Sequence, residues 1–221
     1  AKLESEHQAK VDMGGGAIIN GLLNPQVLLL SGIYLCAVTG MYGLTFFLPT
    51  ILDQFKEASV TMQTVVSILP YALGLVAILL NGAHSDKTRE RRWHTAVPLL
   101  AGSAAMAMCA IFNQHLWLSV VGLALLGFSL YAYIPVFWTH PSSMLAASSA
   151  AVAIGLINSI GNLGGYFGPK FVGQLKDSTG SFSASLWFLA GCIFVAGVLA
   201  CFLKSNKPAE AQSIAVSNYP R

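Results

Sequence analysis

The sequence predicts an all-α membrane protein with six transmembrane helices. Of its 221 residues, 55% are apolar and only 10% are charged, whereas a soluble domain carries roughly 25% charged residues. The apolar residues gather in six blocks of about 20 residues or more, long enough to cross the hydrocarbon core as helices. Four cations and two carboxylates lie together in one short basic stretch between the second and third blocks, which is typical of a loop between membrane helices. These block lengths argue against an unusually apolar soluble helical domain.

Local signals set the expected order of elements. Asn24 and Pro25 suit the cap and first position of a helix, and Pro49 is expected to end that helix. Pro70 falls inside the second apolar block and predicts a kink. The expected elements are a linker (1–25), a six-helix bundle (26–204) with helices at 27–48, 61–83, 94–112, 116–138, 146–172 and 182–203, and a polar tail (205–221).

The distribution of Lys and Arg predicts the orientation of the bundle. Six spans place both ends of the chain on one side of the membrane. That side receives most of the cations, namely Lys2, Lys10, Lys87, Arg89, Arg91, Arg92, Lys204, Lys207 and Arg221, and the other side receives Lys56, Lys170 and Lys176. By the positive-inside rule, both ends and the basic stretch are expected in the cytoplasm, in a multi-pass protein of the cell inner membrane.

Several function classes lack support in the sequence. Cys36, Cys109, Cys192 and Cys201 lie inside apolar blocks without metal-ligand spacing, so neither a disulfide nor a metal site is expected. No basic surface rich in aromatic residues indicates nucleic-acid binding. No catalytic constellation or glycine-rich phosphate loop is recognisable, so we expect neither an enzyme nor a cofactor.

The fifth apolar block carries the most informative polar side chains. Asn158 and Asn162 are four residues apart and share one helix face. An amide in hydrocarbon needs polar partners, so this face is expected to look into the protein or a wet cavity and to bind a polar substrate. The alternative is that the amides bridge to neighbouring helices, because glycines at 161, 164, 165 and 168 allow close approach.

Aromatic residues provide further candidates for substrate binding. Tyr34 and Tyr42 are eight residues apart and fall roughly on one face of the first helix, and Trp138 ends the fourth. Phenolic hydroxyls lining a cavity would suit an anionic or polyhydroxyl ligand. Packing between helices or at the membrane interface is the alternative for all three residues. No Asp or Glu lies inside the expected spans, so a proton relay would need groups elsewhere.

The basic stretch carries a resemblance to a known family. Its pattern, Gly82-x-x-x-Asp86-x-x-x-x-Arg91-Arg92, resembles the signature loop of the major facilitator superfamily of transporters. Within that superfamily the chain resembles the anion:cation symporters, which include permeases for tartrate, phthalate and hexuronates. The segments that carry the resemblance are FLPTIL (47–52), SDKTRERRWH (85–94), PVFW (135–138), INSIGNLGG (157–165), GP (168–169) and KDSTG (176–180).

The resemblance implies a fold of twelve helices in two halves, with substrate bound between them at the midplane. This chain resembles the C-terminal half, and its polar start without Met also predicts a piece of a longer protein. The implied partners are the N-terminal six-helix half, which would carry the arginine and carboxylate known for such symporters, and the lipid bilayer. By the same resemblance, Asn162 is expected on the helix whose amide lines the substrate cavity, and Trp138 on a helix that contributes to the cytoplasmic gate.

The basic loop is expected to act in gating. Asp86 is placed to cap another helix at its cytoplasmic end. Arg89, Arg91 and Arg92 would hold the loop against carboxylates or lipid headgroups, and Gly82 opens the motif. Such a latch would stabilise the outward-facing state. The alternative is that the cations set only the topology.

The expected function is secondary active transport of a small organic anion, a carboxylate or sugar acid, by alternating access with a proton or another cation. An uncoupled facilitator or antiporter of a phosphorylated or sugar-acid substrate is an alternative. A six-helix channel or non-transporting membrane subunit is another, although a channel would need a polar face on several helices.

Overall fold

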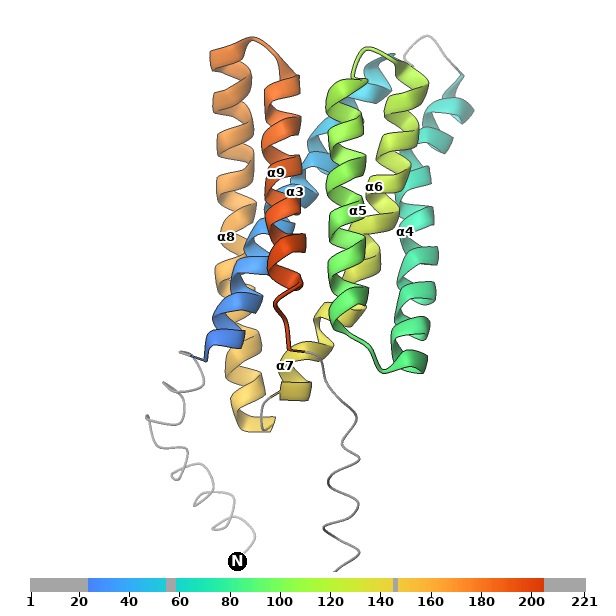
Figure 1. The fold of residues 1–221 in the computed structure, drawn as a ribbon. Helices are drawn as coiled ribbons and strands as arrows, with labels where there is room; N and C mark the ends of the chain where they lie inside the picture. The colour runs from blue at the N-terminus through green and yellow to red at the C-terminus, as the bar shows by residue number, and fades with distance from the viewer. Residues whose placement is uncertain (1–23, 55–58, 145–146, 205–221) are drawn as a thin grey trace, which may run out of the picture.

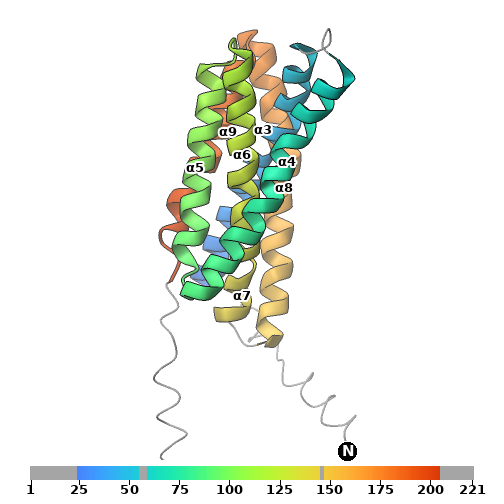
Figure 2. The same cartoon turned by 90° about the vertical axis from the view of Figure 1, so that its right-hand side faces the viewer.

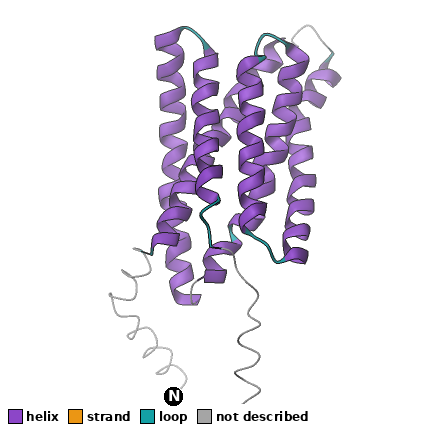
Figure 3. Ribbon diagram, viewed as in Figure 1, coloured by secondary structure: helices purple, strands orange, loops and turns teal. Residues whose placement is uncertain are grey.

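The computed structural model describes residues 24–54, 59–144 and 147–204 (Figure 1). The expected linker, apart from its last two residues, and the expected tail lie outside these residues. Helices are the regular elements throughout the described part, joined by short loops (Figure 3). They are α3 (Pro25–Gln54), α4 (Val60–Thr88), α5 (Arg92–Ile111), α6 (Leu116–Phe137), α7 (Thr139–Met144), α8 (Ala147–Thr179) and α9 (Phe182–Ala200).

The all-α, six-span prediction is confirmed. Among the described residues, six helical segments are long and apolar enough to cross a membrane. They are 25–50, 60–88, 92–111, 116–144, 150–179 and 182–200, and the fourth combines α6 with the short α7. The chain is therefore a multi-pass membrane protein.

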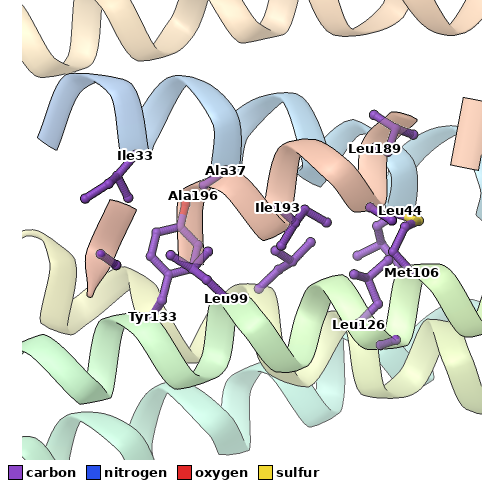
Figure 4. Close-up of a cluster of buried hydrophobic side chains, with 14 of the residues drawn as sticks. Ile33, Ala37, Leu44, Leu99, Met106, Leu126, Tyr133, Leu189, Ile193 and Ala196 are labelled. Carbon is purple, nitrogen blue, oxygen red and sulfur yellow. The ribbon is translucent and has the colours of Figure 1, made fainter. Parts of the chain in front are cut away.

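Four helices meet in the middle of the bundle. Figure 1 shows α8 and α9 on one side and α4, α5 and α6 on the other, with α3 crossing obliquely from the first group to the second. α5 packs on α9, and α3 contacts α8, α9 and α6. The core lies where α3, α5, α6 and α9 converge (Figure 4). Its fully buried side chains include Ile33, Leu99, Met106, Tyr133 and Ile193.

The outer helices α4 and α8 are the most exposed spans, since only 22% and 28% of the residues in their most apolar stretches are buried. α4 packs mainly on α6, and α8 on α3 with a smaller contact to α9. A quarter turn of the molecule shows α4 crossing in front of α6 (Figure 2). Large parts of both helices therefore lack cover from other described elements.

Glycines let the helices approach closely at two crossings. A Cβ atom on Gly127 of α6 would overlap the backbone of Pro70 in α4. A Cβ atom on Gly164 of α8 would lie 2.6 Å from the backbone oxygen of Leu35 in α3. Such close backbone approach is how membrane helices gain packing energy without a hydrophobic driving force.

Three helices run past the expected ends. α3 continues through Pro49 to Gln54, α4 reaches Thr88, and α8 reaches Thr179. The expected ends marked where the sequence turns polar, which reflects the membrane boundary and not the end of helical hydrogen bonding. Proline is also tolerated inside membrane helices, where it removes one backbone bond.

Asn81 of α4 hydrogen-bonds to a backbone carbonyl that Pro98 of α5 leaves without its helical partner. Pro98 has no N–H for the carbonyl of His94, four residues earlier in α5. The Asn81 side-chain amide donates to that His94 oxygen at 2.9 Å and to the backbone oxygen of Ala132 in α6 at 2.7 Å. One amide therefore joins α4, α5 and α6.

Candidate functional site

The amide pair, defined as Asn158 and Asn162, lies near the middle of α8. Both side chains are exposed in this chain, and Asn162 Nδ2 donates to Asn158 Oδ1 at 3.0 Å. Each asparagine amide has two N–H groups, so one N–H of Asn162 and both N–H groups of Asn158 are left as donors. Among the described residues the amides bond to each other rather than bridging to another helix. The pair therefore presents donors suited to carboxylate or hydroxyl oxygens.

Four glycines in the middle of α8 face α3, namely Gly161, Gly164, Gly165 and Gly168. A Cβ atom on Gly161 would overlap the ring of Tyr34, and one on Gly165 would lie 2.7 Å from the Tyr42 hydroxyl. This stripe of small residues thus serves close packing of α3 on α8. It also places Tyr34 and Tyr42 next to the helix that carries the amides.

An aromatic cluster joins α3 to the end of α6. Tyr34 stacks on Phe137 with ring centroids 5.4 Å apart and meets Trp138 edge-on at 5.0 Å. Trp138 is half-buried, as is Tyr34, and both therefore keep exposed ring surface. Two of the predicted aromatic residues are thus brought together, whereas Tyr42 lies two turns further along α3 and stacks on Phe46.

The other predicted site is the basic turn, defined as residues 84–92 between α4 and α5. Asp86 lies in the last turn of α4 and pairs with Arg91, at 2.7 Å between Oδ1 and Nη1. Arg91 also donates to the buried Ser85 hydroxyl at 3.3 Å, and Ser85 donates to the backbone oxygen of Glu90 at 2.6 Å. Within the described residues Asp86 thus holds its own turn, and its capping of another helix stays a prediction.

Glu90 caps the start of α5. Its carboxylate accepts from the backbone N–H groups of Trp93 and His94 at 2.8–3.2 Å, and His94 Nδ1 lies 2.8 Å from Oε2. Partial burial acts to raise the pKa of Glu90, but these hydrogen bonds outweigh it and hold the pKa below its usual value. The carboxylate is therefore charged at neutral pH and stabilises the positive end of the α5 dipole.

The remaining motif residues differ in environment. Arg89 ends α4 in the left-handed region (φ 54°), a position that favours glycine. Arg92 begins α5, and its guanidinium lies 4.9 Å from the centre of the Trp93 ring. Gly82 lies inside α4, half-buried, with room for a Cβ atom 3.8 Å from Pro135. The motif is therefore mostly helix end, with a turn of only three residues outside α4 and α5.

Carboxylates remain absent from the interiors of the described helices. Asp86 and Asp177 fall within the six helical segments, but only in the last turns of α4 and α8. His140 is fully buried at the start of α7, where its Nε2 lies 3.3 Å from Thr95 Oγ1.

The model of the major facilitator superfamily matches residues 18–218. The chain belongs to the major facilitator superfamily. This family consists of transporters and not enzymes, in agreement with the class expected from the sequence.

Similarity to individual transporters adds to the family match. The chain is 37% identical over 172 residues to a quinolone resistance transporter of Acinetobacter baumannii, covering 78% of this chain and 39% of that protein. It is 30% identical over 212 residues to a candidate tartrate transporter of Agrobacterium vitis (96% and 47%). It is 32% identical over 191 residues to a candidate metabolite transport protein, NicT, of Pseudomonas putida (86% and 43%). The chain thus spans about half the length of these relatives, and the predicted resemblance to organic-anion transporters of this superfamily is confirmed.

Sequence reasoning did not identify Asn81. Its amide lies at the end of an apolar block. A polar residue inside a span suggests a contact between helices but does not identify the partner. The free carbonyl that it satisfies is 13 residues away in the chain, and Pro98 was the one available signal.

Proposed function

We propose that this chain forms the C-terminal half of a secondary transporter that moves a small organic anion by alternating access, in symport with a proton or another cation. The amide pair carries the proposal. It presents three N–H donors at the middle of α8, on a helix face that no other described element covers.

The position of the amide pair argues for a wet cavity and not a lipid contact. α8 has 33 residues, so both asparagines lie about 16 Å or more from either end of the helix at 1.5 Å per residue. Amide groups at that depth are costly in hydrocarbon. Substrate sites of transporters lie near the midplane at the interface of the two halves.

The identity of the partner follows from the same geometry. A second six-helix half would cover the exposed face of α8 and enclose the amides and the free surface of Tyr34 and Trp138. No cation lies beside the amide pair among the described residues. The substrate's charge would then be balanced by groups of the N-terminal half, which also supplies the coupling carboxylate.

We place the protein in the cytoplasmic membrane, with the basic turn and both ends of this chain in the cytoplasm. The excess of Lys and Arg on that side supports this orientation. In this setting the basic turn acts in gating through Asp86 and Arg91, whose pair would open as the two halves rock.

Uptake of labelled organic acids tests the proposal. Vesicles would hold the intact protein with and without a proton gradient, and would be compared with vesicles holding Asn162→Ala. We expect gradient-driven uptake of a dicarboxylate or sugar acid and at least a tenfold loss in the variant, because losing hydrogen bonds to a charged group costs about 1.5–3 kcal/mol.

Gln174→Ala is the matched control, because Gln174 is another exposed amide residue on α8, 12 positions further along. Uptake unchanged by Asn162→Ala at equal expression would show that the amide pair does not bind substrate and serves helix packing instead. Uptake indifferent to the gradient would favour a facilitator or antiporter. Absence of uptake with every acid would favour a channel or a non-transporting subunit.

A further inference from the structure

A groove lies on the side of the bundle away from α8. It is lined by α4, α5 and α6. Its volume is about 580 Å³, and α8 supplies none of its described lining. The groove is therefore separate from the proposed substrate face. Its lining residues are mostly apolar and come from α4, α5 and α6, among them Leu80, His84, Trp93, Val97, Ala101 and Leu125.

One end of the groove is polar and adjoins the basic turn. His84 Nδ1 lies 2.6 Å from His94 Nε2. Because the Glu90 carboxylate can only accept, His94 Nδ1 carries the proton between them, at 2.8 Å. When His94 is neutral, its Nε2 accepts from His84 Nδ1, and the other His84 nitrogen is left for another partner.

Two cations of the basic turn, Lys87 and Arg92, have no carboxylate partner among the described residues. Within the described residues, the carboxylates of the basic turn are already engaged, Asp86 by Arg91 and Glu90 by His94. Lys87 shares a helix face with Leu80 and His84, which lie seven and three residues before it. Arg92 lies over Trp93, which lines the groove, and its buried Nε has no hydrogen-bond partner among the described residues.

We propose that this groove binds one anionic phospholipid. An acyl chain lies along Leu80, Val97 and Leu125, and the phosphate is held by Lys87 and Arg92. The groove joins an apolar channel to an excess of positive charge, which complements the two parts of such a lipid. Trp93 stands between them, at the level where tryptophan meets the headgroups.

Native mass spectrometry of the intact protein in a mild detergent tests this proposal. Phosphatidylglycerol and phosphatidylcholine with identical acyl chains would be titrated separately. We expect tighter retention of phosphatidylglycerol, and Lys87→Gln should weaken it about fivefold, since one cation near a lipid surface contributes about 1 kcal/mol. Retention of phosphatidylcholine should not change.

A second pair of variants tests the acyl-chain position. Ala101→Phe fills the groove, whereas Ala104→Phe adds the same ring one turn away on α5, outside the lining; both alanines are exposed, so the fold should tolerate them. We expect Ala101→Phe to lose both lipids and Ala104→Phe to retain them. Equal retention of the two lipids by the unmodified protein, or normal retention by Ala101→Phe, would overturn the proposal.

Discussion

Gly164 lies at the crossing of α3 and α8, where a single methyl group has no room. A Cβ atom there would lie 2.6 Å from the Leu35 backbone oxygen and 2.7 Å from Thr39 Oγ1, about 0.8 Å inside the 3.4 Å at which ordinary contact begins. Neither atom can swing aside, because Thr39 Oγ1 donates to that same Leu35 oxygen at 2.8 Å. Gly164→Ala must therefore push α8 away from α3, at a cost of about 1–3 kcal/mol for such overpacking.

Gly173→Ala is the matched control, since a Cβ atom on Gly173 of the same helix meets nothing within 4 Å. Both variants gain about 1 kcal/mol of helix propensity, so their difference isolates the packing cost. Thermal unfolding in detergent should place Gly164→Ala about 2–12 °C below the control, at roughly 2–4 °C per kcal/mol. Equal melting temperatures would show that the crossing is looser than the geometry requires, and would refute the packing argument.

Two further predictions concern the basic turn. Asp86→Asn should change stability by less than about 1 kcal/mol, because the Asp86–Arg91 pair is partly solvent-exposed. The same variant should slow uptake if the pair opens during gating. Asp53→Asn, an exposed change at the opposite end of the bundle, is the control, and equal uptake rates of the two variants would contradict the gating role. Glu90→Gln should lower stability at neutral pH by about 1 kcal/mol through the weakened cap. Because the folded-state pKa of Glu90 is depressed, its stabilisation is present above the unfolded value of about 4.3 and is lost as pH falls through the folded pKa. Chemical unfolding from pH 7 to pH 3 should therefore show the two proteins converging in acid, and a constant difference would exclude the carboxylate as its source.

The fold class was predictable because six long apolar blocks leave few alternatives once backbone groups must be satisfied inside lipid. The helix ends were less predictable. Residues 173–179 continue α8 although they are mostly polar, because polar side chains do not interrupt backbone hydrogen bonds; Gly180, in the left-handed region at φ 66°, follows the helix end.

The candidate site was predictable in its residue types but not in its partners. Asn158 and Asn162 were recognisable from their spacing on one face. Their mutual hydrogen bond, and the contact of Gly161 with Tyr34, depend on rotamers and helix crossings that spacing does not determine. The Asp86–Arg91 pair likewise depends on where α4 ends, which hydropathy placed before Asp86.

Asn81 has a consequence for how the chain is made. Its two acceptors lie 13 and 51 residues later in the sequence, so both are synthesised after Asn81. At about 5–20 residues per second, Ala132 follows Asn81 by roughly 3–10 s. During this interval α4 must hold an incompletely satisfied amide at the insertion machinery, pairing first with α5 and then with α6. The order of synthesis thus becomes the order in which these three helices lock together.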